Sequence, residues 1–202
     1  MEAVYVKEIE EWLKELTGAD KVIAFGPTLR QTEPQPGTHY QPPGRDVHID
    51  YKDDRSHRMA RTFITGSDEP DFQYSRFQCI NLWRAISPPP QDWPLAICDA
   101  QSVAPDEGTQ NLMIRVDKLP ELDKLGPIDN EDSLPAAYLF TYKQGHRWYY
   151  FSDMKPNELL LFKLYDSANP QGRCPHAAFL DEGREGAIPR ESVEIRTILY
   201  FK

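Results

Sequence analysis

Cysteine is scarce in this sequence. Only three of the 202 residues are cysteines, Cys79, Cys98 and Cys174, and no two of them lie close together in the chain. An odd number of widely spaced thiols is not the pattern of a disulfide framework and is typical of a protein kept in a reducing compartment. The sequence therefore predicts a cytoplasmic protein.

Long hydrophobic runs and an excess of basic residues are also missing. No apolar stretch approaches the length that crosses a bilayer, and the N-terminus is acidic and helical rather than signal-like. The 23 basic residues are outnumbered by 32 acidic ones, which gives a net charge of −9. Because a nucleic-acid surface should be basic, we expect neither a nucleic-acid nor a membrane partner. A small-molecule substrate is expected, and the oligomeric state is not indicated.

Internal repeats, low-complexity tracts and an alternating strand and helix rhythm are absent too. The 18 prolines favour short segments joined by turns. Apolar residues at helical spacing between Val4 and Leu16 predict one amphipathic helix, which Thr17 and Gly18 end. The expected strands, nine or ten in all, include residues 21–25, 47–51, 77–86, 93–99, 112–116, 137–143, 147–152, 159–165 and 192–201. This pattern predicts a mainly β fold with one domain over residues 1–202, a two-sheet jelly roll (a cupin-like double-stranded β-helix) with the helix packed outside.

Several local expectations accompany this fold. The turn Gln144-Gly145 predicts that residues 137–143 and 147–152 form a hairpin. The aromatic run from Trp148 to Phe151 is interpreted as core rather than pocket. The charged residues 52–58 indicate a solvated turn or the start of a helix, and residues 118–134 an acidic loop. His39 and His57 are expected to have no role in a site.

The last strand carries the first functional signal. Successive side chains of a strand point to opposite faces, so Arg190, Ser192, Glu194 and Arg196 share one face and an apolar set shares the other. Two arginines and a serine in line make a good receptor for a carboxylate, since arginine offers a rigid fork that stays charged. The alternative is a surface strand with ordinary salt bridges.

A second cluster lies far upstream. His48 and Asp50 are spaced by two, so on a strand they point the same way and can bind one metal ion together. With the distant His176 they match a facial triad of two histidines and one carboxylate, which leaves open positions on Fe(II). Asn81, on the face that it shares with Trp83, either hydrogen-bonds a bound ligand or is a structural amide.

The order His-x-Asp, distant His, then Arg-x-Ser resembles the Fe(II)/2-oxoglutarate-dependent dioxygenases. Further stretches are similar to their fungal hydroxylase/desaturase group, which includes gibberellin desaturase and AsaB-like enzymes and is related to the cephamycin methoxylation protein. The similarity covers nearly the whole chain, although the region before the first helix is shorter than is usual in that group. These stretches are residues 5–30, 80–84, 92–99, 146–151, 159–163 and 174–179.

The resemblance implies an oxygenase that needs Fe(II), 2-oxoglutarate and O2. It would hydroxylate, desaturate or cyclise a small secondary metabolite or an amino-acid-derived compound. His48, Asp50 and His176 would hold the iron. Arg190 and Ser192 would bind the far carboxylate of 2-oxoglutarate, and Arg196, nearer the metal, the other carboxylate.

Two alternatives remain open at this point. One is a related iron oxidase or isomerase that does not use 2-oxoglutarate. The other is a jelly-roll binding protein without catalytic activity. Affinity for 2-oxoglutarate discriminates the first alternative, and metal binding without cosubstrate turnover would indicate the second.

Overall fold

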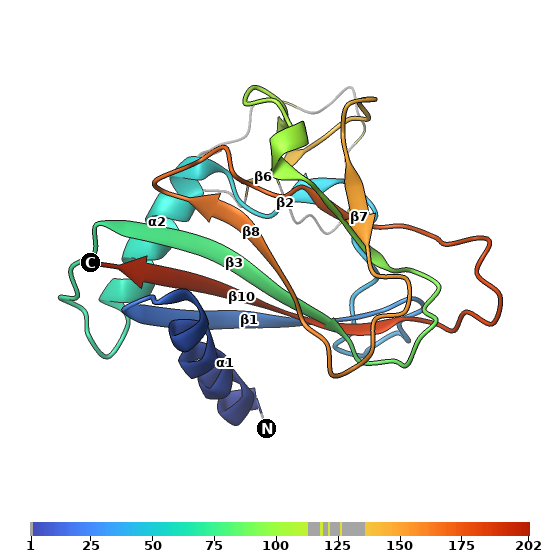
Figure 1. Ribbon diagram of the computed structural model, residues 1–202, viewed down its shortest axis with the longest axis horizontal. Helices are drawn as coiled ribbons and strands as arrows, with labels where there is room; N and C mark the ends of the chain where they lie inside the picture. Colours follow the sequence, from blue (N-terminus) through green and yellow to red (C-terminus); the bar gives the residue numbers. More distant parts are fainter. Residues whose placement is uncertain (1, 113–117, 119–120, 122–125, 127–135) are drawn as a thin grey trace.

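Two antiparallel β-sheets form the body of the protein. The computed structural model describes residues 2–112, 118, 121, 126 and 136–202 (Figure 1). The first sheet has the order β1-β10-β3-β8, with β1 Lys21–Gln31, β10 Glu191–Phe201, β3 Arg76–Ala85 and β8 Leu160–Asp166. The second has the order β5-β6-β2-β9-β4-β7, with β5 Thr109–Leu112, β6 Ala136–Leu139, β2 His48–Ile49, β9 His176–Ala178, β4 Leu95–Cys98 and β7 Trp148–Tyr150. The predicted mainly β jelly roll is confirmed.

The main core lies between the two sheets. Strand β10 contributes Ile198 and Tyr200 to it, and both side chains are fully buried. Strand β3 contributes Phe77 and Trp83, and Ile49 comes from β2 in the facing sheet. Because side chains alternate along a strand, the even-numbered residues of β10 point inward, among them Ser192, Glu194 and Arg196, and Arg190 directly precedes the strand.

The helix α1, Glu2–Thr17, lies against the outer face of the four-stranded sheet (Figure 1). Ile9 and Leu13, one helical turn apart, are buried in a second cluster with Val22, Leu82 and Leu199. Each such side chain stabilises the fold by about 1.5–3 kcal/mol. The outer position predicted for this helix is confirmed, and both faces of β10 are consequently covered.

The second helix is longer than the sequence pattern predicted. The charged run expected as a turn or helix start begins α2, Asp53–Thr65, which continues for 13 residues. Its buried residues, Ser56, Ala60 and Ile64, recur every four positions, but the charged side chains between them obscure the stripe. Tyr200 of β10 donates its hydroxyl hydrogen bond to the carbonyl of Ala60 at 2.9 Å, which ties α2 to the core.

The strand β1 is longer than its sequence pattern suggests. The expected end at Gly26-Pro27 is wrong, because the pairing with β10 shifts register between Phe25 and Thr28 and then resumes to Gln31. Gly26 takes a positive φ of 57°, a conformation that glycine adopts without strain. The bulge therefore lets one strand carry residues on both sides of a Gly-Pro pair.

The predicted hairpin of residues 137–143 and 147–152 is also wrong. Strand β6 pairs with β5 and β2, whereas β7 pairs with β4 at the far edge of the sheet. A local turn does exist, with the amide of His146 donating to the carbonyl of Lys143 at 3.1 Å. Beyond it, however, the guanidinium of Arg147 binds Asp99 Oδ2 at 2.6 Å and directs the chain to β4.

Because β7 lies at the edge of its sheet, the aromatic residues in and directly after it are exposed. Trp148, Tyr149, Tyr150 and Phe151 are all at least 38% exposed, so their assignment to the core is wrong. The strand expected at 159–165 is confirmed as β8. The expected strand 112–116 and the acidic loop 118–134 lie almost entirely outside the described residues. Within the described part, no helix combines the length and apolar character that crossing a bilayer would require.

Candidate metal and cosubstrate site

Two adjacent strands bring the predicted ligands together. His48 of β2 is the register partner of His176 of β9, and the two ring centroids are 4.4 Å apart. Asp50 directly follows β2, so its side chain points to the same side as that of His48. Residues more than half the chain apart in sequence thus meet at one point between the sheets.

The atoms available for a metal lie close enough to share one ion. The Nε2 atoms of His48 and His176 lie 3.4 Å and 3.7 Å from Asp50 Oδ1. The ligand atoms of the three residues all lie within 4.8 Å of one another. The Nδ1 atoms of His48 and His176 face the carbonyls of Asp46 and Cys174 at 2.7 Å and 3.3 Å. A carbonyl only accepts, so Nδ1 carries the proton and the Nε2 lone pair is left for a metal.

The electrostatics of the cluster also suit a cation. Burial lowers the pKa of His176 to about 3, so this imidazole is neutral at neutral pH. Burial alone would raise the pKa of Asp50, but its contact with His48 and the charge of Arg196 hold it well below the ordinary value. A neutral imidazole and an ionised carboxylate are the forms that bind metals.

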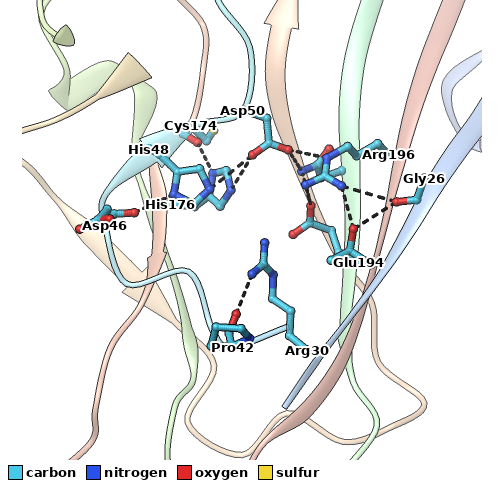
Figure 2. A network of polar contacts seen from close by, with 12 residues as sticks. Gly26, Arg30, Pro42, Asp46, His48, Asp50, Cys174, His176, Glu194 and Arg196 are labelled. Atoms are coloured by element: carbon cyan, nitrogen blue, oxygen red, sulfur yellow. Dashed lines mark hydrogen bonds and ion pairs between the residues drawn. The ribbon is translucent and has the colours of Figure 1, made fainter. Parts of the chain in front are cut away.

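A polar network holds Asp50 from behind (Figure 2). Its Oδ2 accepts hydrogen bonds from Arg196 Nε at 2.7 Å and from Asn81 Nδ2 at 3.2 Å. Arg196 Nη2 and Asn81 Nδ2 also reach Glu194 Oε1, at 2.9 Å and 3.1 Å. This network is buried apart from the partly exposed Arg196. Arg196 and Asn81, which the sequence suggested as ligands of the cosubstrate, therefore contact the candidate metal ligand.

Arg190 and Ser192 form an open polar site on the same strand face. Arg190 is 1% exposed, and its Nη1 donates to the carbonyl of Trp93 at 2.7 Å. Its guanidinium carbon lies 5.4 Å from the centroid of the Trp83 ring. Arg190 Nε and Ser192 Oγ are buried with no hydrogen-bond partner among the described residues. Burial, followed by the charge of Arg30, lowers the pKa of Arg190 to about 10.

A third arginine was missed in the sequence. Arg30 of β1 lies directly across from Ser192 of β10, so it shares the inward face. Its Nη1 donates to the carbonyl of Pro42 at 2.7 Å, and its guanidinium points toward the space beside Glu194 and the imidazoles (Figure 2). The available signal was the spacing of Thr28 and Arg30, which places both side chains on one face of a strand. This rule applies only if the strand continues past Gly26-Pro27.

A cavity of about 360 Å³ opens at this site. Its walls include His48, Asp50 and three arginines, Arg30, Arg55 and Arg196. This volume lies within the range of small-molecule sites, roughly 300–1,000 Å³. Two of the candidate metal ligands, His48 and Asp50, are therefore reachable by a small organic ligand.

Two imidazoles and one carboxylate at a cavity between the sheets of a jelly roll are characteristic of non-haem iron oxygenases, and this donor set fits Fe(II). The unpaired buried atoms of Arg190 and Ser192 fit an anionic cosubstrate. Comparison with known proteins agrees: the chain belongs to the Fe(II)/2-oxoglutarate-dependent dioxygenases, which are oxidoreductases.

The relatives support this membership over nearly the whole chain. A dioxygenase of this type from Aspergillus novofumigatus, nvfI, is 30% identical over 99% of this chain and 67% of the relative. The alpha-ketoglutarate-dependent dioxygenase phiK of a fungal species is 32% identical over 98% of this chain and 69% of the relative. The family described as an oxidoreductase/YMDC permease-like domain matches residues 1–200.

The fold agrees with a solved structure as well. The iron and alpha-ketoglutarate-dependent endoperoxidase NvfI superposes with a TM-score of 0.82 at 28% identity, over 99% of this chain and 69% of the other. The chain thus spans about two thirds of the length of these relatives.

Proposed function

We propose that this chain is an Fe(II)/2-oxoglutarate-dependent oxygenase that hydroxylates, desaturates or cyclises a small secondary metabolite or an amino-acid-derived compound. His48, Asp50 and His176 would hold the iron, and Arg190 with Ser192 would bind the far carboxylate of 2-oxoglutarate. When bound, the iron, 2-oxoglutarate and O2 supply the oxidising power that removes hydrogen from an unactivated C–H bond.

The observation that carries the cosubstrate assignment is the pair of unpartnered buried atoms, Arg190 Nε and Ser192 Oγ. Leaving a buried donor or hydroxyl unbonded costs about 1–3 kcal/mol, and a buried charge costs more. No carboxylate of the described residues lies within 4.0 Å of the Arg190 guanidinium. A carboxylate ligand would satisfy the arginine and the hydroxyl together, which favours a 2-oxoglutarate enzyme over an oxidase or isomerase that lacks it.

The remaining residues of the site would position and shield these groups. Arg196 and Asn81 would fix Asp50 through its Oδ2, which leaves Oδ1 directed at the metal. The Phe162 ring, 4.6 Å from that of His176, would exclude water on the buried side. Arg196 is thus proposed as a positioning residue instead of a cosubstrate ligand.

The wider setting follows from the same considerations. We propose that residues 1–202 act as one jelly-roll domain in the cytoplasm, where the three free cysteines would stay reduced. Neither a nucleic acid nor a membrane is proposed as a partner, because the net charge of −9 opposes binding to either polyanion.

Thermal unfolding under anaerobic conditions tests the proposal. Mn(II), the redox-quiet substitute for Fe(II), should raise the midpoint, and 2-oxoglutarate should raise it further. A ligand at one hundred times its dissociation constant stabilises by about 2.7 kcal/mol, or about 5–10 °C for a chain of this size. Arg190→Ala should lose the 2-oxoglutarate increment only, whereas Arg184→Ala, which alters an exposed pair with Asp153, should keep both increments.

Each other outcome has a distinct meaning. A metal shift that ignores 2-oxoglutarate in the wild-type protein would favour the oxidase or isomerase. The absence of any metal shift would favour the non-catalytic binding protein.

A further inference from the structure

The walls of the cavity beside the candidate metal ligands hold more positively charged side chains than negatively charged ones. Among the described residues that line it, the acidic one is Asp50, which is already paired with Arg196 at 2.7 Å. Arg30 and Arg55 line the same cavity. The chain as a whole is strongly acidic, so this local excess of positive charge is a property of the cavity.

Arg30 has a neutral partner only. Its Nη1 donates to the carbonyl of Pro42, and none of the described carboxylates lies within 4.0 Å of its guanidinium. The side chain is half-buried and points toward the space beside Glu194 and the imidazoles (Figure 2). Four of its five N–H donors are therefore available to a ligand.

Arg55 lies in the first turn of α2, and its guanidinium carbon is 5.8 Å from the centroid of the Tyr51 ring. This residue, too, has no carboxylate partner in the described part of the chain. The Tyr51 ring restricts the guanidinium while the N–H groups at its edge stay free, an arrangement suited to a planar anion.

We propose that the substrate of this oxygenase carries a carboxylate, and that Arg30 and Arg55 bind it so that a neighbouring C–H bond faces the metal. This inference rests on the proposed function, since it assigns the substrate class of the same cavity. Arg190 and Ser192 take the cosubstrate, so the two remaining arginines are free for a second anion. Arginine forks bind carboxylates through paired, charge-assisted hydrogen bonds.

Paramagnetic relaxation tests this assignment without turnover. The full chain is loaded with Mn(II) and saturating 2-oxoglutarate under anaerobic conditions, and the ¹⁹F relaxation of 4-fluorophenylacetate is compared with that of neutral 4-fluorophenylacetamide. We expect strong, saturable relaxation of the carboxylate and about tenfold weaker binding of the amide, the loss expected for one charge-assisted contact. Because relaxation by Mn(II) falls steeply with distance, it also reports that the probe lies in this cavity.

The variants attribute the effect to particular residues. Arg55→Ala and Arg30→Ala should each weaken carboxylate binding about tenfold and leave amide binding unchanged. Arg55→Lys keeps the charge without the fork, so its affinity for the carboxylate should lie between that of the alanine variants and that of the wild type. Arg58→Ala is the matched control, because Arg58 lies one turn along α2 and pairs with Asp54 at 2.9 Å; it should change nothing.

Two results would overturn the proposal. Equal relaxation of the acid and the amide would show that the arginines do not select an anion. Displacement of the probe by excess 2-oxoglutarate would show that they serve the cosubstrate instead.

Failure of the proposed function would look different. Without metal binding neither probe would be relaxed, and saturation-transfer measurements on the metal-free chain would still compare the acid with the amide in wild type and Arg55→Ala. If the metal-free chain prefers the acid and this preference is lost in Arg55→Ala, the carboxylate site is supported even though the proposed function has failed. If the metal-free chain shows no such preference, the carboxylate site is excluded as well.

Discussion

The inner face of β10 has two polar halves that differ in one respect. Around Arg196 the network is closed with respect to charge, since Asp50 and Glu194 pair with this arginine and accept from Asn81 Nδ2, although Asn81 Oδ1 has no described partner. Around Arg190, six positions earlier on the same strand face, the network is open, because the arginine Nε and the hydroxyl of Ser192 have no described partner. Buried charges are nearly always paired, so an arginine that already has acidic partners positions them, whereas a buried arginine without an acidic partner is suited to an anionic ligand.

The open half is held in place by groups that do not neutralise it. The carbonyl of Trp93 and the ring of Trp83 contact the Arg190 guanidinium without supplying a negative charge. An arginine over an aromatic face gains about 0.5–2 kcal/mol, less than desolvation of the charge costs. The site is therefore stabilised most when an anion arrives. The following predictions test this difference between the two halves.

The largest effect is expected for the metal itself. His176→Ala removes one of the three proposed ligands, and we expect Mn(II) affinity to fall about a thousandfold or more, with loss of turnover. The unfolding midpoint of the metal-free protein should change little, since the removed ring is a site residue beside the core. Isothermal titration with Mn(II) measures the first expectation and calorimetric unfolding the second.

His39→Ala is the control for that experiment. His39 is exposed in the loop between β1 and β2 and lies outside the ligand cluster. Unchanged metal affinity in His176→Ala would refute the ligand assignment, and an equal loss in both variants would show a nonspecific effect.

The second effect separates the two arginines directly. Arg190→Ala should weaken 2-oxoglutarate binding about 100-fold and leave Mn(II) affinity within a few-fold, because it removes a charged donor from the open half. Arg196→Ala should instead weaken Mn(II) affinity about 10- to 100-fold through loss of support for Asp50. The reverse result would mean that the roles of the two arginines are exchanged.

Much of this site could be predicted from the sequence. The alternation along 190–196 placed four polar side chains on one face, and the period-two spacing of His48 and Asp50 placed both toward one point. These rules are local to a strand, and the strands involved are regular. The fold class followed from the same kind of evidence, many short strands with no alternating helices.

What the sequence did not show depends on contacts between distant segments. Arg30 was missed because Gly26-Pro27 resembles a strand end, and only pairing with β10 carries β1 across it. The roles of Arg196 and Asn81 depend on which acid lies opposite, which no spacing rule reports. The wrong hairpin has the same origin, since Gln144-Gly145 favours a turn but Asp99 and β4 decide where the next strand goes.

A third, smaller effect tests whether closed networks away from the cavity are only structural. Asp166 of β8 is 1% exposed and accepts hydrogen bonds from Arg76 and Gln78 of β3. Asp166→Asn should lower the free energy of unfolding at pH 7 by about 2 kcal/mol, measured by urea denaturation, and leave 2-oxoglutarate affinity unchanged. Asp106→Asn, at an exposed position, should change neither quantity.

The pH dependence of that difference has a definite sign. Burial would raise the pKa of Asp166, but the bonds from Arg76 and Gln78 outweigh it and lower the pKa well below the ordinary value. A lowered folded-state pKa gives stability that is fully present above the unfolded-state pKa, about 3.9, and is lost as the pH falls toward the folded-state value. The difference in the free energy of unfolding between wild type and Asp166→Asn should therefore decrease from pH 5 to pH 2. A constant difference would exclude the ion pair as its cause.

The smallest effect is the one that distinguishes an open group from a closed one most directly. Ser192→Ala removes a hydroxyl with no partner, so 2-oxoglutarate should bind about 2- to 10-fold more weakly while the ligand-free protein becomes no less stable. Ser87 supplies the matched control, since its buried Oγ accepts a hydrogen bond from the amide of Glu191 at 3.0 Å. Ser87→Ala should lower the unfolding free energy by about 1 kcal/mol and leave 2-oxoglutarate affinity unchanged. If Ser192→Ala destabilised the ligand-free protein as Ser87→Ala does, its hydroxyl would have a structural partner, and the open half of β10 would lose one of the two atoms that define it.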